Sequence, residues 1–253
     1  MITSTSFYYD GIYSEDMGVI KVRVGGGLVT DSFLSPVSVN QVKLKNSNKA
    51  RIQTIDREPL TIPMALFFDE NLSEESIRRV KNWLSKEDYR ELRFENEPEK
   101  VYYAVLSGTS ELTHNAVASG YVQLELLTNS SYSFSNVFTI EGISNETDFS
   151  YVSIHNYGDE IAPTDIAVTM INNSTSDIEI YNETTQENLK LVGNLANEEI
   201  VFMGEYEEIH TSSNLRHRYN DHNGVFISLQ VGENRLRVKG DFKYKIEAQF
   251  IYK

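Results

Sequence analysis

The sequence predicts a mainly β protein with one α-helix, built from two domains. Short segments in which apolar and polar residues alternate recur in both halves, whereas residues 73–86 have the spacing of a helix. With 253 residues and 40% hydrophobic composition, the chain can form a core in each of two domains. Residues 1–135 hold 14 basic and 18 acidic side chains, and residues 136–253 hold 9 and 19. We therefore expect an N-terminal domain over 1–135 and a more acidic C-terminal domain over 136–253.

The first half is expected to contain strands on both sides of the helix. Every second residue from Leu60 to Phe68 is a large apolar one, and the same pattern returns from Val122 to Leu126. Proline has no backbone N–H to donate, so Pro63 predicts an edge or a bulge in the earlier strand. The glycine run at 25–27 indicates a turn, because no phosphate-binding motif surrounds it.

A single amphipathic helix is expected near residues 73–86. Ser73 can accept a hydrogen bond from a free N–H of the first turn, and the two glutamates after it favour the positive end of the helix dipole. Ile77, Val80 and Leu84 share one face, whereas the basic residues fall elsewhere. Trp83, the only tryptophan of the chain, is expected in the core beside that face.

The second half predicts a β-sandwich of short strands. The clearest strand runs from Phe242 to Tyr252, because aromatic and aliphatic residues alternate there with polar ones. Residues 225–231 predict a strand, 232–234 a turn, and 236–238 the returning strand of a hairpin. Regular spacing of this kind is typical of a sandwich, and further strands are expected at 166–170, 178–180 and 189–191.

Composition argues against several classes of protein. The chain has no cysteine, which fits folding in a reducing cytoplasm without disulfides or cysteine-ligated zinc. Its N-terminus does not resemble a signal peptide, and no stretch reaches the ~20 apolar residues that span a bilayer. Between 136 and 209 the only basic residue is Lys190, against fifteen acids. We therefore expect no membrane association and no specific binding of nucleic acid.

The opening of the chain resembles the start of the distal tail (Dit) proteins, a family of siphophages that infect Gram-positive bacteria. The segment YYDGIYSEDMGV at 8–19 is similar to the aromatic-x-Asn/Asp-Gly-x-x-Ser-x-Asp-x-Gly start of that family. Asp10-Gly11 and Met17-Gly18 supply the turn residues that such a start requires. This segment is the most specific part of the resemblance.

The order of the later segments is also similar to that family. The Pro-interrupted strand of 57–68 precedes the helix, and residues 98–103 lead into the next strand. In the second half, 177–182 and 232–236 resemble the family's hairpins. Residues 184–186, Thr-Thr-Gln, lack the glycine often found in the first hairpin turn, which leaves the type of that turn open.

The resemblance implies a β-sandwich-like, ring-forming N-terminal domain and a galectin-like or carbohydrate-module-like C-terminal β-sandwich. It implies a structural virion protein without enzymatic activity, which forms a homo-hexameric ring at the hub of the tail tip or baseplate. That ring joins the tail tube protein to the tail-associated tip or fibre protein, can stack on a second ring, and leaves a channel for DNA. The protein would lie at the distal end of the virion tail, serve host adsorption, and be folded and assembled in the host cytoplasm.

The densest polar cluster of the sequence is the run from Arg216 to Gly224. His217, Asp221 and His222 could approach a cation, but their spacing matches neither a helical i, i+4 pair nor a zinc motif. A turn ending at Asn223-Gly224 explains the composition better. Glycosidases use two carboxyl groups that flank the scissile bond, and the adjacent acids Asp159-Glu160 and Glu207-Glu208 are candidates for such a pair. Adjacent residues on a strand, however, point to opposite faces. We assign no catalytic, cofactor-binding or metal-binding residue.

The alternative function is a carbohydrate-binding adsorption module that recognises glycans on the host surface. A β-sandwich that exposes tyrosines could stack a sugar ring on them, and fifteen tyrosines are available. Protein–protein contacts and half-buried strand positions use the same residues. An open aromatic groove would favour the module, and the candidates are Tyr151, Tyr157, Tyr181, Tyr206 and Tyr219.

Overall fold

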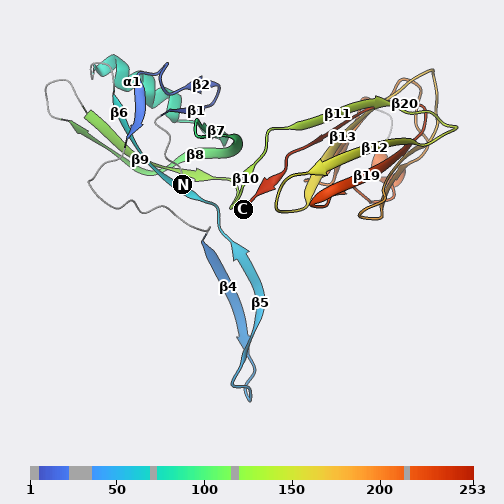
Figure 1. The fold of residues 1–253 in the computed structure, drawn as a ribbon, viewed down its shortest axis with the longest axis horizontal. Helices are drawn as coiled ribbons and strands as arrows, with labels where there is room; N and C mark the ends of the chain where they lie inside the picture. Colours follow the sequence, from blue (N-terminus) through green and yellow to red (C-terminus); the bar gives the residue numbers. More distant parts are fainter. Residues whose placement is uncertain (1–5, 23–35, 69–72, 115–119, 214–216) are drawn as a thin grey trace. The chain divides into compact units, whose positions relative to one another are not determined.

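The computed structural model describes residues 6–22, 36–68, 73–114, 120–213 and 217–253. The chain divides into two compact units, one of residues 1–134 with Lys253 and one of residues 135–252 (Figure 1). Each unit is mainly β, and α1 lies in the first, so the predicted fold class is confirmed. The glycine run at 25–27 lies outside the described residues.

An antiparallel sheet in the order β2-β1-β7-β8-β9-β6-β3 forms the body of the first unit. The short strand β10 (Ser133–Phe134) pairs with β8 at Val101. The strands of the sheet, in chain order, are β1 (Phe7–Tyr9), β2 (Ile12–Tyr13), β3 (Val19–Val22), β6 (Thr61–Phe68), β7 (Arg90–Phe94), β8 (Glu97–His114) and β9 (Gly120–Thr128).

The proline in β6 sits where the sheet can accept it. From Thr61 to Phe67, β6 pairs with β9, and Pro63 lies opposite Glu125. On the other side, the described part of β3 pairs only with Ala65–Phe68. Within the described residues Pro63 therefore lies on an edge, as its missing N–H predicts.

The helix begins where the sequence predicts and ends slightly earlier. α1 spans Glu74–Leu84, and the Ser73 hydroxyl accepts a hydrogen bond from the Ser76 N–H at 3.0 Å. Val80, Trp83 and Leu84 are buried, whereas Ile77 is half-buried against the same core. The range expected near 73–86 extends two residues past the end of the helix, because Ser85, with ψ of 78°, leaves the helical conformation after its N–H closes the last turn on the Lys81 carbonyl.

The second unit is a sandwich of two antiparallel sheets. One sheet has the order β11-β20-β13-β16-β17, with β18 paired to β13, and the other has the order β12-β19-β14-β15. Their inward-facing aliphatic and aromatic residues form one continuous core. The strands of the two sheets are β11 (Phe138–Ile143), β12 (Ser150–Asn156), β13 (Ala162–Met170), β14 (Ile178–Asn182), β15 (Glu187–Leu191), β16 (Glu199–Met203), β17 (Glu208–Thr211), β18 (Ser228–Leu229), β19 (Gly232–Lys239) and β20 (Phe242–Ala248). The last short strand, β21 (Ile251–Tyr252), belongs to neither sheet.

Two predictions for this unit need correction. The last strand is not continuous, because β20 ends at Ala248 and the backbone of Phe250 exchanges hydrogen bonds with Ser135 instead. Residues 232–234 are not a turn, because they open β19 and pair with β12. The chain turns just before them, where the buried Asn234 side chain bonds both the N–H and the carbonyl of Gln230. β18 therefore belongs to one sheet and β19 to the other, and they form no hairpin.

Candidate functional site

The longest fully exposed strands of the described chain form the hairpin of β4 (Val37–Lys43) and β5 (Ala50–Arg57). Among the described residues these strands pair only with each other, and they form a sheet of their own (Figure 1). Every residue of both strands is exposed. An isolated two-stranded hairpin is marginally stable in water, so a hairpin of this kind gains most from a surface that covers it.

One face of the hairpin holds four of its exposed aliphatic side chains together with Gln41 and Arg57, and the other face is largely polar but includes Val42. Val39 lies opposite Ile55, and Val37 shares their side by alternation along β4. The register shift between Asn40 and Gln41 adds one residue to β5, which brings Ile52 to the same side as Ile55. The apolar side chains of this face are 45–60% exposed: Val37, Val39, Ile52 and Ile55.

The opposite face is organised by side-chain hydrogen bonds. The Asn40 amide donates to Thr54 Oγ1 at 3.0 Å and to the Asp56 carboxylate at 3.2 Å. Thr54 also donates to Asp56, at 3.2 Å. These three polar side chains therefore have hydrogen-bond partners within the hairpin. The aliphatic side chains of the other face are exposed and available for contact with a partner.

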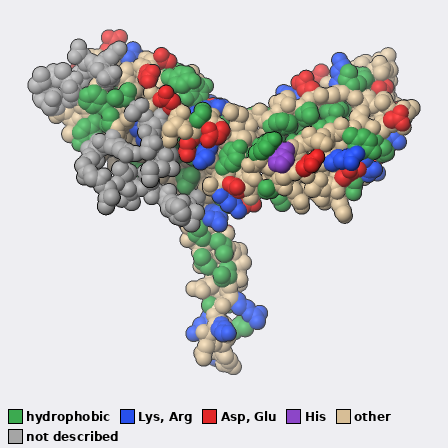
Figure 2. All heavy atoms as spheres, viewed as in Figure 1, with side chains coloured by type: hydrophobic (Ala, Val, Ile, Leu, Met, Phe, Trp, Pro, Cys, Tyr) green, Lys and Arg blue, Asp and Glu red, His purple; other side chains and the backbone are tan. Residues whose placement is uncertain are grey.

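The tip of the hairpin is basic although the chain as a whole is acidic. Residues 43–51 hold Lys43, Lys45, Lys49 and Arg51 without any acid, in a chain whose net charge is −14. Figure 2 shows apolar side chains along the hairpin and Lys and Arg side chains near its tip. The sequence did not predict this element, because alternation alone does not distinguish an uncovered hairpin from strands of a sheet.

The opening segment of the chain packs against α1 within the first unit. Asp10 and Gly11, with φ of 48° and 85°, form the two-residue turn between β1 and β2. Trp83 Nε1 donates to the Tyr9 carbonyl at 2.9 Å, and Arg79 donates to the Met17 carbonyl at 3.3 Å. Lys86 pairs with Asp10 at 2.5 Å. The segment and α1 are therefore one packed structure.

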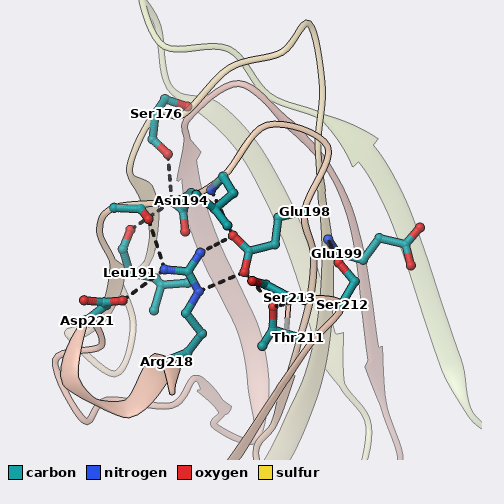
Figure 3. A network of polar contacts seen from close by, with 12 residues as sticks. Ser176, Leu191, Asn194, Glu198, Glu199, Thr211, Ser212, Ser213, Arg218 and Asp221 are labelled. Atoms are coloured by element: carbon teal, nitrogen blue, oxygen red, sulfur yellow. Dashed lines mark hydrogen bonds and ion pairs between the residues drawn. The ribbon is translucent and has the colours of Figure 1, made fainter. Parts of the chain in front are cut away.

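The predicted polar cluster near residue 220 surrounds a buried ion pair that the sequence did not reveal. Arg218 is only 1% exposed, and both its Nε and Nη2 donate to Glu198, which is 3% exposed (Figure 3). Arg218 Nη1 donates to the Gly193 carbonyl and to Asp221, each at 3.0 Å. Burial alone would raise the pKa of Glu198, but hydrogen bonds from Arg218, Thr211 and the Leu195 N–H hold it below its usual value.

The two histidines of that cluster have different surroundings. His217 is exposed, whereas the ring of His222 packs against Phe202 and Phe226 at centroid distances of 5.5 and 5.0 Å. This burial lowers the pKa of His222 below its usual value. Asp221 accepts from Arg218, so its carboxylate serves the ion pair. The segment forms a short turn, Arg218–Asn220, and ends at Gly224 with φ 78°, which agrees with the turn interpretation.

The outward face of β12, β19 and β14 carries aromatic residues that are covered by cationic side chains. Arg235 lies over the Tyr151 ring at 4.7 Å, and Arg237 lies over the Tyr181 ring at 4.7 Å. Glu183 pairs with both guanidinium groups, at 3.5 and 3.3 Å. A sugar would have to displace these contacts before it could stack on either ring, so this face disfavours the carbohydrate module.

The remaining tyrosine and carboxylate candidates do not converge. Tyr157 and Tyr206 are 70% and 65% exposed, and the Tyr219 hydroxyl accepts from the Ile209 N–H. Asp159-Glu160 and Glu207-Glu208 lie in or beside loops. Within the described ranges, no group of acidic and histidine side chains is arranged to hold a metal ion. No helix there is long and apolar enough to cross a bilayer.

Comparisons with known proteins identify both halves of the chain. A family model described as a phage tail protein N-terminal domain matches residues 2–130, and one described as a phage tail C-terminal domain matches residues 131–248. A relative from Bacillus subtilis strain 168, an SPβ prophage-derived uncharacterized protein, YomH, is 26% identical over 251 residues, covering 98% of both chains.

Solved structures agree on the fold. The Dit protein (gp 19.1) of phage SPP1, described as a paradigm of the hub adsorption apparatus in phages infecting Gram-positive bacteria, aligns with a TM-score of 0.67 at 14% identity over 97% of this chain and 98% of its own. A chain of the activated phage P2 baseplate aligns with a TM-score of 0.57 at 7% identity, covering 97% of both. The expected resemblance is confirmed: the chain belongs to the family of phage tail proteins defined by these two domains, and it has the fold of the distal tail protein.

Proposed function

We propose that this phage tail protein is a distal tail hub, which forms a hexameric ring between the tail tube and the tail-associated tip protein. The fold shared with SPP1 Dit and with the P2 baseplate chain supports a place in the tail or baseplate. The distal end of the virion tail, assembly in the host cytoplasm and a purely structural, non-enzymatic role belong to the same proposal. The apolar face of the β4–β5 hairpin carries the argument for a ring.

The hairpin face is the kind of surface that assembly would bury. Its four aliphatic residues are large, β-branched and exposed, and they lie on one side of a hairpin that no other strand of the described ranges extends. Protein interfaces have an apolar core that excludes water, surrounded by polar groups. A neighbouring copy that covers this face would supply the core, while the polar network of Asn40, Thr54 and Asp56 remains in water.

Replacing the cross-strand pair Val39 and Ile55 with serine should prevent ring formation. Both side chains are already exposed in the single chain, at 49% and 55%, so their loss should change the free energy of unfolding by less than about 1 kcal/mol. The matched control replaces the opposite-face pair, Asn40→Ser with Thr54→Ser, which should keep the ring. Light scattering or native mass spectrometry measures the mass of the assembly that each variant forms. A ring formed equally well by both double variants would contradict a role for the apolar face.

We further propose that residues 1–135 carry ring closure and that residues 136–253 form a separable domain. Limited proteolysis of the whole protein should cut between Asn129 and Asn136, where the family models also change from one domain to the other. The N-terminal fragment should retain the mass of an oligomer, while the C-terminal fragment stays monomeric. The reverse distribution of masses would show that the second domain builds the ring.

A ring of this protein would conduct DNA with little tendency to retain it. Six copies with a net charge of −14 each carry −84. Mobile ions screen this charge over about 8 Å at physiological salt, but repulsion of phosphates close to an acidic wall persists. The scarcity of basic residues in 136–209 supports the same property.

A further inference from the structure

Two exposed turns of this protein carry opposite charge. One is the basic tip of the β4–β5 hairpin, with Lys43, Lys45, Lys49 and Arg51 around Leu44, which is 58% exposed. The other is the turn between β16 and β17, residues 204–207, with Glu205 and Glu207 beside Tyr206 and with Glu208 opening β17. We call it the acidic turn.

The acidic turn has a fixed base and an exposed end. Met203 pairs with Glu208 to close it, and the Gly204 N–H donates to the Thr164 carbonyl and to Asp165 at 3.1 and 3.0 Å. Residues 205–208 are all exposed, and Tyr206 is 65% exposed. The turn therefore presents an aromatic ring and three carboxylates in a position set by the sandwich below it.

We propose that the basic tip of one copy binds the acidic turn of a second copy. This inference rests on the proposed ring, because the apolar hairpin face within residues 1–135 brings the copies together, and the acidic turn of the C-terminal domain adds to that contact without being required for it. Opposite charges then select the partner surface, and the lysines and Arg51 can place a cation over the Tyr206 ring. Leu44 gives the basic tip an apolar group to match that ring.

A second copy fits the basic tip better than nucleic acid does. Four cations would suit a phosphate backbone, but exposed Leu44 at their centre has no counterpart there. The complete chain has a net charge of −14, so its remaining surface repels DNA and attracts the basic tip of another copy. Both halves of the proposed contact are also present in every copy.

Charge reversal tests the pairing on the full-length protein. Lys45→Glu with Lys49→Glu should weaken the ring about tenfold at each interface, which is about 1.4 kcal/mol, because two exposed and therefore weak attractions become repulsions. Glu205→Lys with Glu207→Lys should weaken it similarly, and combining both double variants should restore it. The control, Arg78→Glu with Lys81→Glu on the exposed side of α1, makes the same change in net charge and should have less than a twofold effect. The ring mass is measured by native mass spectrometry and light scattering between low and high salt.

The possible outcomes separate this inference from the proposed function. Wild-type assembly should weaken with salt, whereas assembly of the variant with both reversed lysines should strengthen with salt, because the ions screen the new repulsion. A ring that ignores the reversals, or that the combined variant fails to restore, overturns the pairing and leaves the ring standing. A wild-type protein that is monomeric at every salt concentration overturns both the pairing and the proposed ring. Retention of duplex DNA that is lost with the lysines, at unchanged ring mass, would make the tip a nucleic-acid contact and overturn the pairing as well.

Discussion

Replacing Trp83 with alanine is expected to destabilise the N-terminal domain by about 3–5 kcal/mol. Trp83 is 3% exposed, and its ring stacks on Phe7 and meets Tyr9 edge to face, at centroid distances of 5.6 and 6.0 Å. Alanine would leave a cavity between α1 and β1. It would also remove the hydrogen bond that Trp83 Nε1 donates to the buried Tyr9 carbonyl, and alanine has no side-chain donor to replace it.

Denaturant unfolding followed by circular dichroism measures this loss, because the substitution removes the only tryptophan and with it the fluorescence probe. Trp83→Phe keeps an aromatic ring in the site without the hydrogen bond, so its cost should be intermediate. Arg78→Ala, on the exposed side of the same helix, should stay within about 0.5 kcal/mol of wild type. If Trp83→Ala unfolded like wild type but no longer formed a ring, Trp83 would be an interface residue and its assignment to the core would be wrong.

The start of α1 and the burial of Trp83 could be predicted because both depend on neighbours in the sequence. Ser73 caps a donor three residues later, and the apolar face follows the 3.6-residue period. The partner of Trp83 could not be predicted, because Tyr9 lies 74 residues away and contacts it only after β1 has joined the sheet. The family-like opening and the helix are therefore two parts of one structure, which neither pattern shows by itself.

The hairpin and the false turn at 232–234 show where periodicity fails. Simple alternation would place Ile52 and Ile55 on opposite sides of β5, but the bulge between them brings both to the same face. Residues 232–234 have turn-like composition, but the Asn234 side chain closes the preceding turn while its backbone pairs with β12. Composition locates a change of direction to within a few residues, and side-chain hydrogen bonds decide the register.

The buried ion pair was missed for a related reason. Arg218 and Asp221 stand in a polar run that reads correctly as a turn, but Glu198 lies 20 residues earlier, in an acidic segment where no residue stands out. Full burial of a charge is rare unless it is paired, and the fold provides the partner rather than the sequence spacing. The same reasoning predicts that the second domain is sensitive to the loss of either charge of this pair.

Replacing Arg218 with methionine should destabilise the C-terminal domain by about 3–5 kcal/mol, because Glu198 would remain buried without its partner. The double variant Arg218→Met with Glu198→Leu should lose much less, since no buried charge is left alone. The remaining donors to Glu198, from Thr211 and the Leu195 N–H, cannot replace two bonds from a guanidinium. Calorimetry or denaturant unfolding of the three proteins at neutral pH measures the difference. A double variant as unstable as Arg218→Met would show that packing, and not charge, dominates the site.

The ion pair should also make the domain sensitive to acid. Because the folded pKa of Glu198 lies below its unfolded value of ~4.3, its contribution to stability is complete above that pH and is lost as pH falls through the lower, folded pKa. The wild-type C-terminal domain should therefore lose stability across this acidic range more steeply than the double variant, which has no carboxylate to protonate at that position. His222, whose pKa burial lowers, adds to the same trend, because protonating its ring favours the unfolded chain below about pH 6.5 in both proteins equally. The difference between the two pH profiles isolates the ion pair, and parallel profiles would show that the Glu198 carboxylate contributes no pH-dependent stability.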